Sequence, residues 1–273
     1  MVQYPLTNIH PDAKIGNNVK IEPFATVYGD VEIGDDCWIG PNAVIMDGAR
    51  LGKGVQIFPG AVISSIPQDL KFVGEKTTAI IGDYSVIREY ATISRGTADR
   101  FKTEVGKNCL VMAYVHIAHD CLVGNNCILA NAVQLAGHVV VEDYVVIGGT
   151  TAVHQFVKIG AHCMISGGSL VRKDVPPFTK AAREPLSYVG VNSVGLRRRQ
   201  FPNEKIEEIQ DLYRVIYLEG NTYSKACDII ELKFSPSTER DEILNFIRNS
   251  ERGIMKGYSN GAPGKQEAEN TVI

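Results

Sequence analysis

The sequence contains no apolar run approaching the roughly 20 residues that a membrane-spanning helix needs. Its first residues, MVQYPLTNIHPDAK, lack the basic start and the apolar core of an export signal. There is also no excess of basic residues, because 28 Lys and Arg stand against 31 Asp and Glu, a net charge of −3. That balance argues against general nucleic-acid binding. We therefore expect a cytoplasmic protein with no integral membrane segment and no nucleic-acid partner.

The composition is that of an ordinary globular protein. Apolar residues make up 44% of the 273 residues and charged residues 22%, which excludes a largely disordered chain. This length suits one large domain, or a main domain with a small appendage.

The dominant pattern is a six-residue repeat of aliphatic residues from Ile9 to Val171. Of the 28 positions spaced six apart, 25 are Ile, Leu or Val, and the exceptions are Asp69, Glu75 and Asp99. A small residue usually stands four positions after each aliphatic one. Neither a helix nor simple strand alternation has this period. It predicts a β-helix in which each hexad forms one short strand and a turn, and three hexads close one triangular coil.

The repeat is interrupted twice without a change of phase, at residues 64–80 and 94–104, which we expect to be excursions from the coil. It ends at DVPP, 174–177, because prolines remove backbone donors from a sheet. Helical patterns follow at 202–220, 222–234 and 237–253. The predicted organisation is a β-helix over 1–190, a C-terminal helical domain over 191–257 and a disordered tail over 258–273.

The six cysteines are explained by the repeat. All but one fall on the small inward position of a hexad, namely Cys37, Cys109, Cys121, Cys127 and Cys163, and only Cys227 lies outside the repeat. This placement is typical of small core residues. We expect neither a disulfide nor a cysteine-metal site.

None of the six histidines occupies an inward position. When residue numbers are reduced by the 18-residue coil, His116, His119, His138 and His154 fall together on one edge. His162 falls on another face and His10 lies eight coils away. Such a cluster fits zinc held by three imidazoles, proton transfer by one imidazole, or a polar rim at a subunit contact. The pattern does not choose among the three.

Several motifs resemble one family within the hexapeptide acyltransferases. They are HIAHD (116–120), ILANAVQLAGH (128–138), IGGTTAVHQF (147–156), QDLKFVGE (68–75) and GLRRRQF (195–201). The chain resembles the UDP-N-acetylglucosamine O-acyltransferases over residues 5–257. The resemblance implies a left-handed parallel β-helix that forms a homotrimer with active sites between neighbouring subunits. It also implies transfer of an (R)-3-hydroxyacyl chain from acyl carrier protein to the 3-hydroxyl of the sugar of UDP-GlcNAc, the first step of lipid A biosynthesis, with no cofactor and no metal.

The resemblance assigns three catalytic residues. His119 is the general base, Asp120 orients it, and Gly137 donates its backbone N–H to the oxyanion. The substrate-binding positions that it implies are Asp69, Lys71, His116, His138, His154, Gln155, Asn192, Arg198 and Arg199. Gly167 stands where the family measures acyl-chain length, and the lack of a side chain there favours a long chain. Where the family pattern has a Glu, this sequence has Val194.

The residues alone leave other interpretations open. Asp120 lies directly beneath His138 in the 18-residue map, so a structural pair is the alternative there. Lys71 also fits a solvated loop lysine. The segment 172–199 holds seven Lys and Arg against two acidic residues, a local charge of +5, which fits either a phosphate and carrier-protein site or a solvated surface.

Four rival functions remain beside the main one. They are the N-acyltransferase later in the same pathway, an O-acyltransferase for another sugar nucleotide, an acetyl-CoA-dependent hexapeptide enzyme, and a zinc hydratase of the carbonic-anhydrase type. The N-acyltransferases carry an additional N-terminal domain, and here the repeat begins at Ile9. Metal analysis of the purified protein discriminates the zinc hydratase.

Overall fold

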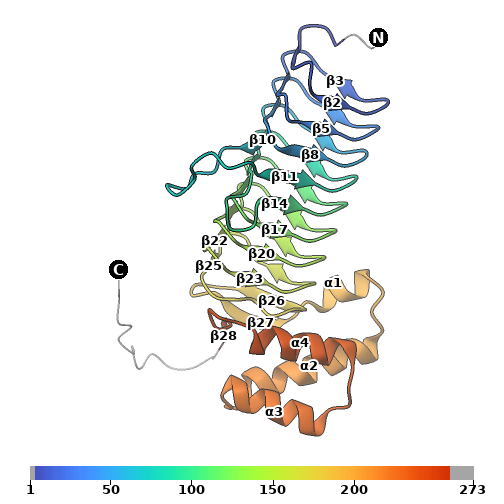
Figure 1. The fold of residues 1–273 in the computed structure, drawn as a ribbon. Coiled ribbons are helices and arrows are strands. Elements are labelled where there is room, and N and C mark those ends of the chain that lie inside the picture. The colour runs from blue at the N-terminus through green and yellow to red at the C-terminus, as the bar shows by residue number, and fades with distance from the viewer. Residues whose placement is uncertain (1–3, 259–273) are drawn as a thin grey trace.

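The computed structural model describes residues 4–258 and shows a column of short strands that ends in helices (Figure 1). Strands β1 to β25 are two to four residues long and follow the three faces of a prism in turn. Every third strand therefore belongs to the same sheet, and within each sheet these strands pair in parallel. The repeat has produced the parallel β-helix that it predicts.

The strands are distributed over three sheets. Sheet A holds β1 (Asn8–Ile9), β4 (Thr26–Val27), β7 (Val44–Ile45), β10 (Val62–Ser65), β13 (Thr92–Ser94), β16 (His116–Ile117), β19 (Gln134–Leu135), β22 (Ala152–Val153) and β25 (Leu170–Val171). Sheet B holds β2 (Lys14–Ile15), β5 (Glu32–Ile33), β8 (Ala49–Leu51), β11 (Thr78–Ile81), β14 (Lys102–Val105), β17 (Leu122–Val123), β20 (Val140–Val141) and β23 (Lys158–Ile159). Sheet C holds β3 (Lys20–Ile21), β6 (Trp38–Ile39), β9 (Gln56–Ile57), β12 (Val86–Ile87), β15 (Leu110–Val111), β18 (Ile128–Leu129), β21 (Val146–Ile147), β24 (Met164–Ile165), β26 (Thr179–Ala182), β27 (Ser187–Val191) and β28 (Lys256–Gly257).

The core of the column is the stack of aliphatic and small residues from each hexad. Successive coils pair with an 18-residue offset, as in Leu110 with Ile128, so equivalent residues lie directly above one another. All six cysteines are free and buried, and for the five that lie within the repeat this is what the repeat predicts. Burial raises the pKa of the Cys121 thiol to about 12, so it stays protonated and unreactive at neutral pH.

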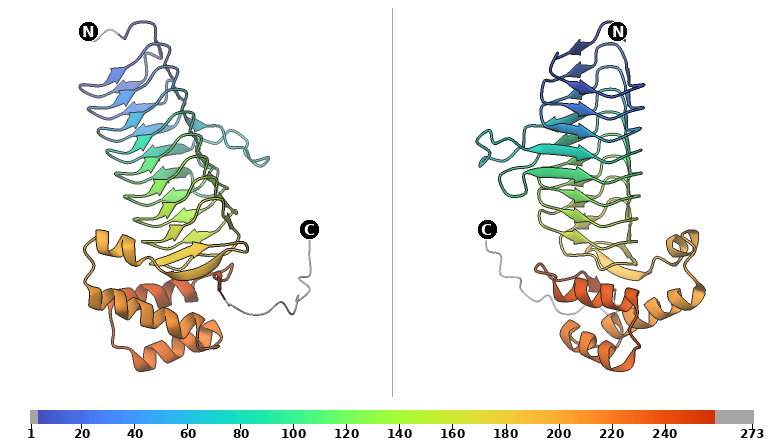
Figure 2. Two further views of the ribbon diagram at one scale, coloured as in Figure 1. Left: turned by 180° about the vertical axis from the view of Figure 1, so that it is seen from behind. Right: turned by 45° about the vertical axis from the view of Figure 1, so that its right-hand side comes forward.

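The two excursions keep the phase because each adds a multiple of six residues to its coil, 30 − 18 = 12 for the first and 24 − 18 = 6 for the second. Across the first, Val62 pairs with Thr92, an offset of 30 residues instead of 18, and across the second Thr92 pairs with His116, an offset of 24. The first leaves the coil between β10 and β11 and projects from the side of the column in both figures (Figures 1 and 2). The second leaves between β13 and β14. Both therefore begin at the corner between sheets A and B.

Four helices follow the coil: α1 (Ser193–Arg198), α2 (Asn203–Tyr217), α3 (Tyr223–Lys233) and α4 (Thr238–Arg248). The last three lie within the predicted helical segments, and α1 has too few residues to give a periodic pattern. They surround a second core that includes Ile209, Leu212 and Ile230. No helix in the described part of the chain is long and apolar enough to cross a membrane.

The end of the coil is closed by β27, which pairs antiparallel to β26, and by β28 from the end of the described chain. The predicted domain boundary at residue 191 stays a prediction. The predicted disordered tail lies, from residue 259 onward, outside the described residues.

Candidate active site

The predicted catalytic residues lie at the corner between sheets A and B, where both excursions also leave the coil. His119 and Asp120 occupy the turn between β16 and β17, and Gly137 and His138 occupy the turn one coil further on, between β19 and β20. The strand pairing of His116 with Gln134 stacks these two turns directly. The 18-residue period is the cause, since it returns the chain to the same corner in each coil.

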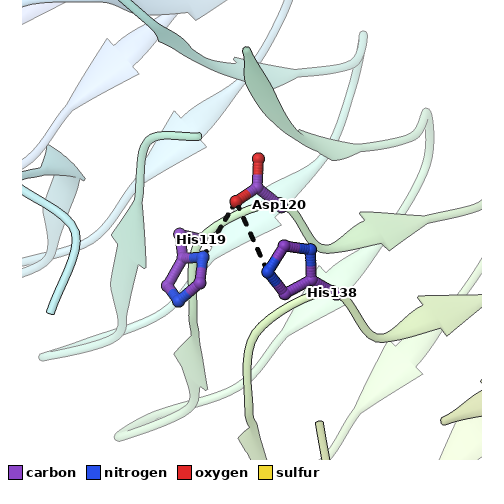
Figure 3. A group of neighbouring side chains, drawn as sticks. All are labelled: His119, Asp120 and His138. Carbon is purple, nitrogen blue, oxygen red and sulfur yellow. Dashed lines mark hydrogen bonds and ion pairs between the residues drawn. The ribbon is translucent and has the colours of Figure 1, made fainter. Parts of the chain in front are cut away.

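Asp120 lies between two imidazoles and hydrogen-bonds one of them (Figure 3). Its Oδ2 is 2.8 Å from Nδ1 of His119 and 3.9 Å from Nε2 of His138. The two rings meet edge to face with centroids 5.1 Å apart. The side chain of Asp120 is fully buried and those of His119 and His138 are about nine-tenths buried. Asp120 is therefore paired with His119, and His138 lies beyond hydrogen-bonding distance.

The Asp120 carboxylate is held by the second excursion. Oδ1 accepts hydrogen bonds from the backbone N–H groups of Thr97 and Arg100, and Oδ2 accepts one from the Thr97 hydroxyl. Burial acts to raise the pKa of Asp120, but the hydrogen bonds from Thr97, His119 and Arg100 outweigh it and hold the pKa below its ordinary value. The carboxylate is therefore ionised at neutral pH and able to accept a hydrogen bond from the Nδ1–H of His119.

Each excursion places one carboxylate near a histidine of this corner, on the ring nitrogen that does not face Asp120. Asp69 Oδ2 is 4.0 Å from Nε2 of His119, and Asp99 Oδ2 is 3.1 Å from Nδ1 of His138, although without the alignment of a hydrogen bond. Glu75 joins the two excursions, because its carboxylate accepts from the N–H of Ala98 and from that of Val73.

Thr97, Asp99, Arg100 and Glu75 were not found from the sequence as site residues. The only signal was that the repeat fails at three positions, Asp69, Glu75 and Asp99; the carboxylates of Asp69 and Asp99 lie near the histidines, and that of Glu75 bonds the second excursion. Lys71 is exposed on the first excursion, and its backbone N–H binds the Asp69 side chain.

Gly137 packs against the His119 ring and has a free N–H. A Cβ at this position would lie 2.7–2.8 Å from ring atoms of His119. At some turns of the coil the residue before a left-handed position donates its N–H to an aspartate oxygen, as Asn17 does to Asp35 and Asn125 to Asp143. Within residues 4–258 no oxygen accepts from the equivalent N–H of Gly137. This N–H is therefore available to an acceptor from outside the described residues.

A groove of about 430 Å³ runs along sheet A beside His119, and its walls include His116, Gly137 and Gln155. His116 is bonded to the Thr92 hydroxyl at 2.7 Å; burial, and then the charge of His119, lower its pKa. His154, one coil beyond His138, is exposed, and its ring contacts the carbonyl oxygen of Gln155. Side chains from three coils thus reach the groove or its rim.

One group of side chains at this corner has the composition of a metal site. Ligand atoms of His119, Asp120 and His138 lie within 4.8 Å of one another. A zinc hydratase site requires a third imidazole. Among the described residues no third histidine joins this group.

The residues predicted to bind nucleotide lie at a different corner, between sheets B and C. There Arg198 and Arg199 line a cavity of about 470 Å³ together with Tyr144 and His162. Arg199 donates to the carbonyl oxygen of Tyr144 and lies over its ring. Burial, and then the Arg199 charge, lower the pKa of His162 to about 4, so this ring is neutral at pH 7.

Asn192 lies beside this cavity, and its side chain hydrogen-bonds to two other residues of the same chain. It caps α1 by accepting from the N–H of Gly195, and it donates to the carbonyl oxygen of His162. Val194, which replaces the expected Glu, is 61% exposed on α1 and offers no polar atom.

Gly167 lies at the third corner, between sheets C and A, in the turn before β25. A Cβ there would approach the carbonyl oxygen of Gly149 at 3.0 Å.

The predicted basic patch is divided, since Arg172, Lys173 and Arg183 line a separate cavity of about 850 Å³ beside β25, away from Arg198 and Arg199. One copy of the chain therefore does not bring together the positions predicted for catalysis, nucleotide binding and chain length.

Comparison with known proteins decides the family. A family model described as UDP N-acetylglucosamine O-acyltransferase, domain 2, matches residues 174–255, and the bacterial transferase hexapeptide model matches 12–45, 30–65 and 102–137. An acyl-[acyl-carrier-protein]–UDP-N-acetylglucosamine O-acyltransferase of Thiobacillus denitrificans is 43% identical over 254 residues, 93% of this chain and 98% of the relative. The chain belongs to the UDP-N-acetylglucosamine O-acyltransferase family.

Solved structures of UDP-N-acetylglucosamine acyltransferases have the same fold. The enzyme from Bacteroides fragilis superposes with a TM-score of 0.92 at 50% identity, covering 94% of this chain and all of that one. The enzyme from Francisella novicida gives 0.90 at 36% identity, covering 93% of each chain. The predicted fold class, a left-handed parallel β-helix with a C-terminal α-helical domain, is confirmed.

Proposed function

We propose that this chain transfers an (R)-3-hydroxyacyl group from acyl carrier protein to the 3-hydroxyl of the GlcNAc of UDP-GlcNAc, the first step of lipid A biosynthesis. Relatives at up to 43% identity are named for an acyl-carrier-protein donor and this sugar nucleotide. The observation that carries the chemistry is the His119–Asp120 hydrogen bond at the edge of an open groove. An imidazole fixed at Nδ1 by a carboxylate presents Nε2 as a base.

The proposed reaction is a single acyl transfer. Nε2 of His119 takes the proton of the sugar hydroxyl, and that oxygen attacks the thioester carbonyl carbon. The carbon–sulfur bond breaks, and the phosphopantetheine thiolate receives the proton back from His119. An alcohol is a weak nucleophile at neutral pH, and general base catalysis of this kind contributes about 10²–10⁴ in rate.

Gly137 supplies the N–H that stabilises the tetrahedral oxyanion in this scheme. The same turn N–H binds carboxylate oxygen at some other turns of the coil, and at Gly137 it is free and adjacent to the His119 ring. An N–H already oriented toward the developing charge does not have to reorganise during the reaction. No cofactor takes part in any step.

The remaining family positions are assigned to substrate binding. Asp69 and Lys71 on the first excursion, with His116, His138, His154 and Gln155 around the groove, bind the sugar and the acyl chain, while Asn192, Arg198 and Arg199 bind the nucleotide. Gly167 sets the length of the acyl chain by leaving its groove unblocked. A cytoplasmic location is part of this proposal.

A homotrimer completes the site in this proposal. His119 and Arg199 lie at different corners of one chain, so a substrate that contacts both needs a second copy. Light scattering should give three times 29.8 kDa. Trimers mixed from His119→Ala and Arg198→Ala chains should regain about a quarter of wild-type activity, because some sites then take both intact residues from different copies. No regain over either variant alone would contradict shared sites.

The reaction itself is tested by product analysis. Purified protein is incubated with UDP-GlcNAc and a panel of (R)-3-hydroxyacyl carrier proteins of increasing chain length, with acetyl-CoA as the alternative donor. We expect sugar nucleotide O-acylated at position 3, with the best rate for a long chain. No product from any carrier-protein donor, together with activity on acetyl-CoA or stoichiometric bound zinc, would overturn the proposal.

A further inference from the structure

The carboxylate of Asp120 receives four hydrogen bonds, and three of them come from the second excursion. Oδ1 accepts from the N–H of Thr97 at 3.0 Å and from that of Arg100 at 3.1 Å. Oδ2 accepts from the Thr97 hydroxyl at 2.6 Å and from His119 Nδ1 at 2.8 Å. The short bond from a hydroxyl to an ionised carboxylate belongs to the stronger class of hydrogen bonds.

The Thr97 hydroxyl has its direction fixed. It accepts from the N–H of Asp99 at 3.3 Å, so its own hydrogen points toward Asp120. The Thr97 residue is only 7% exposed. Water therefore has little access to replace a lost hydroxyl at Oδ2.

The second excursion also holds the backbone of Asp120, through Arg100 and Thr103. The Arg100 guanidinium donates to its carbonyl oxygen at 2.8 Å, and its N–H donates to the Thr103 hydroxyl at 2.8 Å. Asp120 also occupies a left-handed turn conformation, with φ of 59°. The loop thus fixes both the position of the residue and the plane of its carboxylate.

We propose that Thr97 is a positioning residue of the transfer reaction, which acts by holding the Asp120 carboxylate toward Nδ1 of His119. This inference rests on the proposed function. During the reaction His119 gains a positive charge, and the carboxylate that stabilises it must not turn away. The effect of Thr97 is therefore exerted on the transition state and not on sugar binding.

The test compares Thr97→Val, which keeps the shape and removes the hydroxyl, with Thr97→Ser, which keeps the hydroxyl. For Val we expect kcat to fall about 10-fold or more with KM for UDP-GlcNAc within about twofold, and for Ser we expect activity within about threefold of wild type. Thr179→Val is the matched control, because Thr179 is also buried and hydrogen-bonded but lies at the helical end of the column. It should lower the melting temperature without lowering kcat.

Coupling to Asp120 is tested in the Asp120→Asn background. If Thr97 acts through that carboxylate, adding Thr97→Val to Asp120→Asn lowers kcat no further. A full multiplicative loss in the double variant, or a Val variant as active as wild type, overturns the inference. If the wild type itself makes no product, the proposed function fails instead, so the two failures are distinct.

Discussion

At the scale of single residues, Gly137 combines an N–H that no described residue accepts with close packing against the His119 ring. In the proposed reaction this N–H binds the oxyanion while the α-carbon lies beside the base. The absence of a Cβ allows this close packing, since that atom would lie 2.7 Å from Cε1 and 2.8 Å from Nε2 of the imidazole. Only glycine leaves both the donor and the base undisturbed.

Gly137→Ala should therefore damage the base while keeping the N–H. We expect kcat to fall about 10-fold or more, because a displacement of the ring by a fraction of an ångström misaligns proton transfer. Steady-state kinetics measure this, and Gly149→Ala at another corner serves as the control, since its Cβ would meet only the Asn131 backbone. A Gly137→Ala enzyme with wild-type kcat would show that the ring has room to move.

At the scale of elements, the two excursions act as one unit over the histidine corner. The first carries Asp69 and Lys71, and the second holds Asp120 through Thr97 and Arg100. Glu75 connects them by accepting from the Ala98 N–H at 3.0 Å. A loop proposed to bind substrate is thereby tied to the loop that positions the catalytic carboxylate.

Removing the Glu75 hydrogen bonds that join the two excursions should weaken substrate binding and lower turnover together. For Glu75→Ala we expect KM for UDP-GlcNAc to rise and kcat to fall, each about threefold or more, because both loops lose a shared contact. Lys76→Ala, an exposed neighbour in the same excursion, is the control and should change neither. If Glu75→Ala alters only the melting temperature, the contact is structural and the loops work independently.

At the scale of the whole molecule, a buried acidic group of the helical region lies near an acidic group of the coil. Burial, and then the charges of Glu142 and Glu239, raise the pKa of Glu242 on α4 to about 7. Burial likewise raises the pKa of Glu142, in the turn after β20. In the unfolded chain the pKa of a glutamate side chain is about 4.3. The contribution of Glu242 to stability therefore falls as pH rises from about 4.3 through about 7, since the folded state holds this proton longer.

Glu242→Gln removes the charge that is costly at high pH. We expect the variant to melt at a higher temperature than wild type at about pH 8, and the difference to shrink toward about pH 5, where the folded wild type keeps its proton. Thermal unfolding at the two pH values measures this, with exposed Glu207→Gln on α2 as the control for loss of one carboxylate. A variant stabilised equally at both pH values would contradict the raised pKa.

The sequence predicted the column and its histidine corner because both follow from a strict period. Six-residue spacing defines the strands, and the 18-residue coil brings residues 119 and 138 to the same corner. The repeat does not determine the conformation of a loop inserted between two of its strands. The contacts of Thr97 and Arg100 with Asp120 were therefore not predictable. Asn192 shows the same limit, since its capping of the six-residue α1 depends on a helix that is too short to be seen in the sequence.

The most direct measurement is kcat/KM for transfer from an (R)-3-hydroxyacyl carrier protein to UDP-GlcNAc by wild type, His119→Ala and His10→Ala. His10 is an exposed histidine at the opposite end of the column and controls for loss of an imidazole. We predict a loss of at least about 10² for His119→Ala and none for His10→Ala, with unchanged melting temperatures. A His119→Ala enzyme within a few-fold of wild type would contradict the assignment of His119 as the base.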